Sequence, residues 1–171
     1  MSTLGMVHMT FGSAALALGL AVVTLRKGTR LHRTVGHLYF SSMLALNVTA
    51  LSLYRLFGHF GPFHALAIIS LLYLLWGISA AVLRRPRDKW LHSHMRFMLW
   101  SYAGLIAAAI CEITARIPGW NFALAVIVPS LVVCAIGWVL IETKGKATVN
   151  GMSRRQGVAK SFTEAGTEAG R

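Results

Sequence analysis

The chain has 171 residues, of which 56% are hydrophobic and only 13% are charged. Soluble domains carry about 25% charged residues, so a chain this apolar is expected to be covered by lipid rather than by water. The net charge of +12 comes from short basic clusters between apolar runs, without a basic recognition module, and this pattern excludes nucleic-acid binding.

Five long apolar runs follow one another along the chain. A bilayer core about 30 Å thick requires roughly 20 helical residues, and each run approaches that length. The runs are continuous rather than alternating in polarity, so helices are expected instead of strands. The expected fold class is therefore all-α, a polytopic transmembrane helix bundle of about five spans, at residues 4–25, 37–57, 63–83, 95–115 and 122–141.

The connections between these runs alternate in charge. The first and third connections are basic, whereas the second contains no lysine or arginine and the fourth has only Arg116 beside it. Because basic loops stay on the cytoplasmic side, we expect the N-terminus outside and the C-terminus inside. Residues 1–142 are then the transmembrane domain. Residues 143–171, rich in small and polar side chains, are expected to form a flexible, basic cytoplasmic tail.

Histidines mark a faint repeat within the first four runs. His8 opens the first apolar run and His32 follows it, while His64 opens the third run and His92 follows it. In both copies the second histidine comes directly after a leucine in a basic segment. This pattern predicts a tandem pair of helical hairpins that places one histidine of each copy near each membrane surface.

The expected depth of the polar residues separates them into two layers, because a helix rises about 1.5 Å per residue. The outer layer is expected to contain His8, Arg55, His59, His64, Glu112 and Arg116. The inner layer is expected to contain His32, His37, His92 and His94. No histidine falls in the middle of a span, and this arrangement is what a transmembrane electron path with two cofactors requires.

Paired imidazoles within a membrane commonly ligate haem iron. We therefore predict a membrane electron-transfer protein in which His8 and His64 bind an outer b-type haem and His32 and His92 bind an inner one. His37 and His94 are the substitutes for the inner pair. A quinone or another redox partner would exchange electrons with this protein. The alternative occupant of the outer layer is a zinc or copper ion bound by His8, His64 and Glu112.

Glu112 is the acidic residue lying well inside an expected span. Arg116 follows it by one helical turn, in the favourable order for an ion pair. A structural ion pair at the outer rim is one interpretation of this spacing. The other is a proton acceptor, or a carboxylate that orients the imidazole of His8 or His64.

A second class of function also fits the sequence, which identifies no catalytic residue. The chain could be a non-enzymatic membrane accessory, assembly or transport factor. Its histidines would then serve structure, zinc binding or proton sensing. Small residues recur at helical spacing in the first and fourth runs, and such faces favour a homo-oligomer or a larger membrane complex.

Three segments resemble a known family. They are residues 31–39 (Leu-His-Arg-Thr-Val-Gly-His-Leu-Tyr), His8 with Gly12, and residues 91–96 (Leu-His-Ser-His-Met-Arg). Their order and spacing are similar to those in the bacterial membrane proteins called domain of unknown function 2306. The resemblance covers about residues 5–116 and leaves the fifth run as an extension. It implies a multi-pass protein of the bacterial inner membrane and implies no activity.

Overall fold

The computed structural model describes residues 2–53, 58–86, 89–119, 121–145 and 151. These residues form five α-helices and one short π-helical turn, without a strand. The helices are α1 (Thr3–Thr24), α2 (Arg30–Leu51), α3 (Pro62–Leu83), α4 (Trp90–Thr114) and α5 (Phe122–Leu140), followed by the turn Ile141–Gly145. The predicted all-helical fold class is thus confirmed for the part of the chain that the structure describes.

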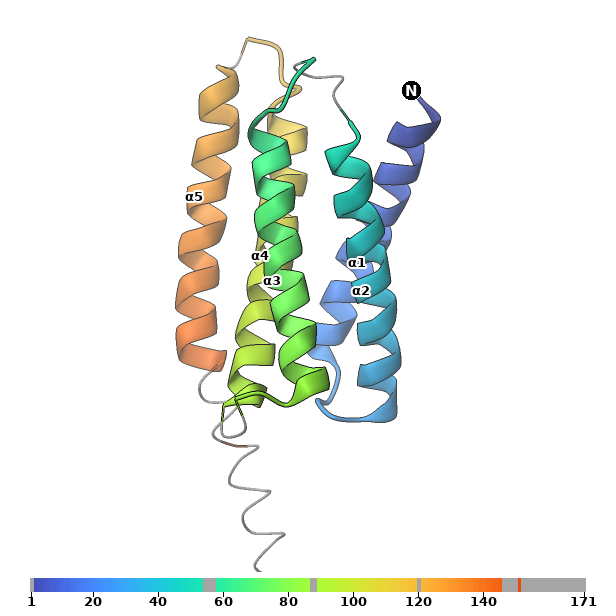
Figure 1. The fold of residues 1–171 in the computed structure, drawn as a ribbon. Coiled ribbons are helices and arrows are strands. Elements are labelled where there is room, and N and C mark those ends of the chain that lie inside the picture. Colours follow the sequence, from blue (N-terminus) through green and yellow to red (C-terminus); the bar gives the residue numbers. More distant parts are fainter. Residues whose placement is uncertain (1, 54–57, 87–88, 120, 146–150, 152–171) are drawn as a thin grey trace, which may run out of the picture.

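The helices run alternately up and down the bundle (Figure 1). We call the end that carries the N-terminus the N-terminal end. The opposite end carries the connections at residues 25–29 and 84–89, and we call it the basic end. The predicted outer and inner layers correspond to these two ends. Most of the predicted tail, residues 146–150 and 152–171, lies outside the described residues.

The bounds of α2 differ from those expected from hydropathy. The helix begins at Arg30 rather than at residue 37, and it ends at Leu51 rather than at residue 57. Thr29 is its N-cap, and the Thr29 hydroxyl accepts the backbone N–H of His32 at 3.2 Å. Capping of this kind starts a helix among polar residues, which an apolar run alone does not include. Residues 54–57 of the expected span lie outside the described residues.

Four of the five helices are long and apolar enough to cross a membrane, namely α1, α3, α4 and α5. Helix α2 is not one of them because it contains several polar residues. Two of these, Ser42 and Asn47, are buried inside the bundle. The Asn47 side-chain amide donates to the Met43 carbonyl at 2.8 Å, so its polarity is satisfied within the protein.

The first four helices form a closed bundle. The hairpins α1–α2 and α3–α4 pack against each other through contacts of α2 with α3 and of α1 with α4. Among the described residues, the backbones of α1 and α3, and those of α2 and α4, do not approach each other closely. These two pairs are therefore the diagonals of the bundle. Helix α5 packs mainly against α4, and Phe122 at its start meets Phe63 of α3, with ring centroids 6.2 Å apart.

An aromatic and aliphatic core holds the four helices together. Tyr39, Met43 and Leu74 are almost completely buried there. The Tyr39 hydroxyl lies 2.8 Å from the Ser101 hydroxyl across the α2–α4 diagonal. The Tyr102 hydroxyl donates to the Leu16 carbonyl of α1 at 3.1 Å. Buried phenol groups usually find such partners, and here the bonds tie three helices together at mid-height.

Side-chain hydrogen bonds also join α4 to α5. Pro129 lies inside α5, so the Ala125 carbonyl lacks the backbone N–H that would normally reach it from one turn later. The Thr114 hydroxyl of α4 donates to this carbonyl at 2.7 Å. The Cys111 thiol donates to the neighbouring Val126 carbonyl at 3.3 Å. Donors on a neighbouring helix are how proline is accommodated in a membrane helix.

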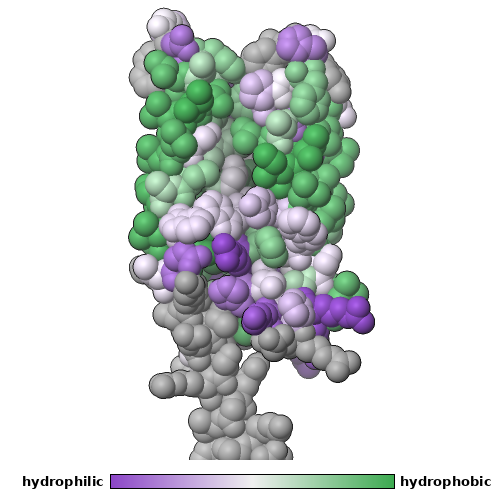
Figure 2. All heavy atoms as spheres, turned by 60° about the vertical axis from the view of Figure 1, so that its left-hand side comes forward, coloured by the Kyte–Doolittle hydropathy of each residue, from purple (hydrophilic) through white to green (hydrophobic). Residues whose placement is uncertain are grey.

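On the face that Figure 2 shows, the surface of the bundle is apolar along its middle and more polar toward both ends. Exposed aliphatic side chains such as Leu20, Val82 and Leu131 each retain about 60% or more of their accessible surface (59%, 68% and 64%). A soluble monomer rarely exposes so wide an apolar surface. This surface is compatible with direct contact to a lipid bilayer.

Candidate cofactor site

The described histidines occur at the two ends of the bundle, as the sequence predicts. His8 and His64 lie in the first two turns of α1 and α3, toward the N-terminal end. His32 and His92 are each the third residue of their helix at the basic end. His59 is exposed in the connection before α3, and Arg55 lies outside the described residues.

His8 is oriented by a hydrogen bond to α2. Its Nδ1 atom lies 3.1 Å from the Thr49 hydroxyl oxygen. The Thr49 hydroxyl already donates its single proton to backbone carbonyls of its own helix, those of Ala45 and Leu46. It therefore accepts from His8, so the proton of the neutral ring is on Nδ1 and the lone pair is on Nε2. A histidine ligand normally has this arrangement.

His64 has the opposite arrangement. It is buried at the start of α3, where its Nδ1 atom accepts the backbone N–H of Gly61 at 3.1 Å. This bond caps the helix, and it places the proton of the neutral ring on Nε2. His64 therefore has a clear structural role in addition to its predicted role as a ligand.

Glu112 and Arg116 form the ion pair that their spacing predicts, with Arg116 Nη2 bonded to Glu112 Oε1. The Glu112 carboxylate is also close enough to His8 to interact with the ring electrostatically. Both side chains of the ion pair are well exposed, so the pair contributes little to stability in contact with water.

His94 and His32 come together at the basic end. The His94 Nδ1 atom lies 2.8 Å from the Gly77 carbonyl oxygen of α3. A carbonyl can only accept, so Nδ1 carries a proton and the lone pair of the neutral ring is on Nε2. Gly77 allows this approach, because a Cβ there would lie 2.7 Å from the Met98 sulfur and 3.2 Å from the Met98 backbone nitrogen.

His32 is held in a positively charged environment before the predicted span. Burial lowers the pKa of the His32 imidazole, and the nearby charges of Lys27 and His94 lower it further, whereas the Val22 carbonyl raises it. The Lys27 ammonium group donates to the Val22 carbonyl at 2.8 Å. The His32 Nδ1 atom is buried and has no hydrogen-bond partner among the described residues. A buried nitrogen of this kind is costly unless something binds it.

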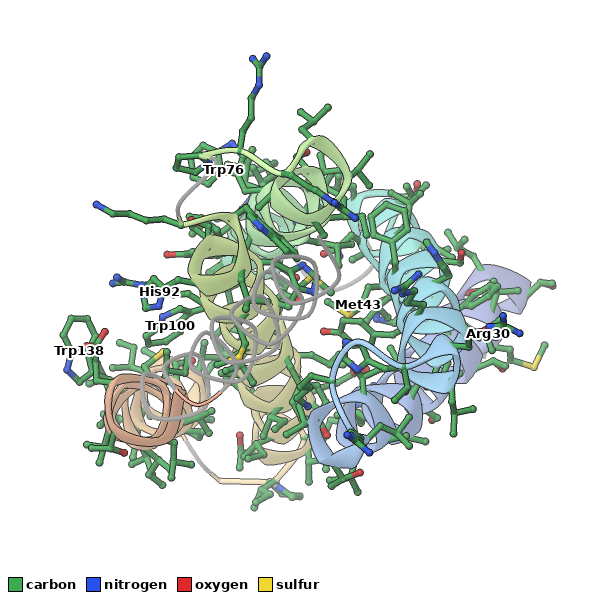
Figure 3. The ribbon with its side chains drawn as sticks, turned by 90° about the horizontal axis from the view of Figure 1, so that it is seen from below. Arg30, Met43, Trp76, His92, Trp100 and Trp138 are labelled. Atoms are coloured by element: carbon green, nitrogen blue, oxygen red, sulfur yellow. The ribbon has the colours of Figure 1, made fainter. Side chains whose placement is uncertain are left out.

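His92 does not take part in this pair. It lies two residues before His94, and residues two apart on a helix point to different faces. His92 lies on the side of α4 that faces α5, with Trp100 and Trp138 (Figure 3). His37 is exposed on α2. His94, which the sequence offers only as a substitute, thus lies near enough to His32 for an electrostatic interaction between the two rings.

The proposed cofactors differ in the number of protein ligands that they need. No group of three or more histidine, cysteine, aspartate or glutamate side chains is arranged to hold a metal ion in the described part of the chain. Zinc and copper sites require three or four protein ligands. Haem iron needs only two, because the porphyrin supplies four nitrogens.

The five-helix bundle, with its apolar middle and polar ends, defines a helical membrane protein with four candidate spans. More particularly, the chain belongs to the family described as Predicted membrane protein (DUF2306), whose model matches residues 5–142. The match extends beyond the resemblance seen at residues 5–116 and includes α5. The chain matches none of the curated proteins and none of the solved structures.

Proposed function

We propose that this chain is a membrane electron-transfer protein that binds a b-type haem between His32 and His94. One observation carries the proposal. These two imidazoles come from helices on a diagonal of the bundle, at the same end, and interact with each other. Axial ligands on opposite sides of a haem iron need this placement.

The surroundings of both rings support the assignment. The Gly77 carbonyl fixes the ring of His94 with Nε2 available, as a second-shell acceptor does for a metal-bound histidine. The buried Nδ1 of His32 lacks a partner among the described residues. Lys27 lies beside this ring, and its positive charge would offset the propionate groups of a haem. When bound, the haem would supply one-electron redox chemistry.

A second haem between His8 and His64 belongs to the same proposal. These residues lie on the other diagonal, toward the N-terminal end. His8 already presents the lone pair of Nε2. The Nδ1 atom of His64 accepts the Gly61 N–H. The ring of His64 would have to break this bond and turn before it could bind iron. The electron partner at this end would be a quinone or a redox protein.

The visible absorption spectrum of the purified protein tests the proposal. Protein made in haem-replete cells is expected to show a Soret band that shifts when dithionite reduces the iron. Stoichiometric zinc or copper without a Soret band would favour the metal-site alternative. A colourless, metal-free preparation would overturn the redox proposal and favour the accessory, assembly or transport role.

We also propose that α2 crosses the membrane, which gives five spans with the N-terminus outside, in the bacterial inner membrane. Its buried polar residues, Ser42 and Asn47, face the bundle rather than lipid. The connections at residues 25–29 and 84–89 carry the basic residues that retain loops in the cytoplasm.

Labelling with a membrane-impermeant maleimide tests this topology. In a background without the two native cysteines, His59→Cys is expected to react in intact cells. Arg26→Cys and Arg85→Cys are expected to react only after lysis. Equal labelling of Arg26→Cys and His59→Cys in intact cells would mean that α2 does not cross.

A further inference from the structure

A groove on the flank of the bundle has no part in the proposed haem site. It has a volume of about 490 Å³ and lies between α3, α4 and α5. Figure 3 shows His92, Trp100 and Trp138 together on this side of α4, away from α1 and α2. The lining residues are Tyr73, His92, Ser93, Arg96, Phe97, Trp100 and Trp138.

The walls of the groove are aromatic. The rings of Trp100 and Trp138 have their centroids 6.4 Å apart, and those of Tyr73 and Phe97 are 5.8 Å apart. Trp138 retains 56% of its accessible surface. Tryptophan and tyrosine favour the boundary between acyl chains and headgroups. Its aromatic walls therefore suit a position near that boundary.

The polar part of the groove is cationic and rich in donors. The Arg96 guanidinium lies 3.9 Å from the Glu142 carboxylate, and its side chain is 43% exposed. That separation is too long for a hydrogen bond, so the guanidinium retains N–H groups for a ligand. The ring of His92 and the hydroxyl of Ser93 add further donors. The positive end of the α4 dipole is also nearby, because the helix begins at Trp90.

A second groove of about 340 Å³ adjoins the first. The two share Ser93 and Phe97, and the second is also lined by Trp76 and Arg85. Two arginines thus lie along one continuous, aromatic-lined surface. Arginine binds phosphate oxygens with two parallel hydrogen bonds.

We propose that this pair of grooves is a specific binding site for an anionic phospholipid. Its phosphate would accept hydrogen bonds from Arg96 and its neighbours on α4, and its acyl chains would lie against Trp100 and Trp138. Charge complementarity favours this occupant, because basic pockets between membrane helices bind anionic headgroups. The site is separate from the histidine pair and does not depend on haem binding.

Native mass spectrometry of the full chain in detergent tests the proposal, with phosphatidylglycerol and phosphatidylcholine as probes. Both lipids carry an anionic phosphodiester, but the choline group of phosphatidylcholine adds a positive charge that Arg96 repels. The unmodified protein is therefore expected to retain phosphatidylglycerol about tenfold better. Arg96→Gln is expected to remove this preference. Arg30→Gln is the matched control, because Arg30 lies at the same end on the far side of the bundle (Figure 3).

A second variant tests the aromatic wall. Trp138→Leu changes an exposed side chain, so the fold should persist, and retention of phosphatidylglycerol should fall severalfold. Equal retention of the two lipids by the unmodified protein would overturn the proposal. An equal loss in Arg30→Gln would also overturn it, because general surface charge would then explain the binding. A quinone that co-purifies and is lost in Arg96→Gln would assign the groove to a different ligand.

Discussion

The His94→Ala variant is expected to lose the haem absorption band of the proposed site almost completely. His94 supplies one of two axial ligands, and the Gly77 carbonyl holds its ring with Nε2 available. His32→Ala should have the same effect, because a single imidazole does not hold a b-type haem in the bis-histidine form. The measurement is the Soret absorbance per mole of purified protein, with helical content followed by circular dichroism. Where the His8–His64 haem is also bound, the absorbance should fall to the share of that haem.

His92→Ala separates the two possible pairings. It changes a histidine only two residues from His94, on a different face of α4, and the Soret band is expected to persist. His59→Ala, at an exposed position in a connection, is the control for histidine removal in general. Loss of the band in His92→Ala, with retention in His94→Ala, would restore the pairing predicted from the repeat and contradict the one proposed here.

The Gly19→Ala variant is expected to destabilise the bundle by about 1–3 kcal/mol, the usual cost of overpacking a core. A Cβ at this position would lie 2.3 Å from a carbon of the Tyr102 ring and 3.0 Å from one of Tyr39. Tyr102 cannot move freely, because its hydroxyl is bonded to the Leu16 carbonyl. Thermal unfolding in detergent, followed by circular dichroism, measures the effect.

Gly104→Ala is the matched control for this variant. Gly104 also lies within a helix, but a Cβ there meets nothing within 4 Å. Its replacement should leave stability unchanged or raise it by about 0.5–1 kcal/mol, because alanine loses less conformational freedom in a helix. Equal stability of Gly19→Ala and the unmodified protein would contradict the tight packing described here.

The helical class and the arrangement of histidines at two ends are predictable from the sequence, since both depend on apolar runs and on position along them. Which face of each helix meets the bundle is harder to predict from the sequence. The repeat aligns His32 with His92 because both follow leucine, yet a shift of two residues to His94 changes the face of α4. Which face meets the bundle depends on the packing of α3 and on Gly77. A motif of six residues does not contain that information.

Two further features depend on local hydrogen bonds that hydropathy does not record. Because Thr29 caps α2, the helix begins at Arg30 rather than at residue 37, seven residues earlier than the apolar run. His32 therefore lies inside a helix. The sequence predicts a ligand or an unspecified structural role for His64, and the structure shows that its ring caps α3 through Gly61. A histidine two residues after a proline at a helix start signals such a cap, because its ring can reach back to the preceding backbone N–H.

The proline in α5 has a consequence for how this helix can move. If α5 separated from α4, the Ala125 carbonyl would lose the Thr114 hydroxyl, the donor that replaces its missing backbone N–H. Helices α4 and α5 should therefore tilt or slide as one rigid unit. Any rearrangement of the bundle would then occur where this unit meets α1 and α3, and the spacing between Trp100 and Trp138 would stay constant throughout.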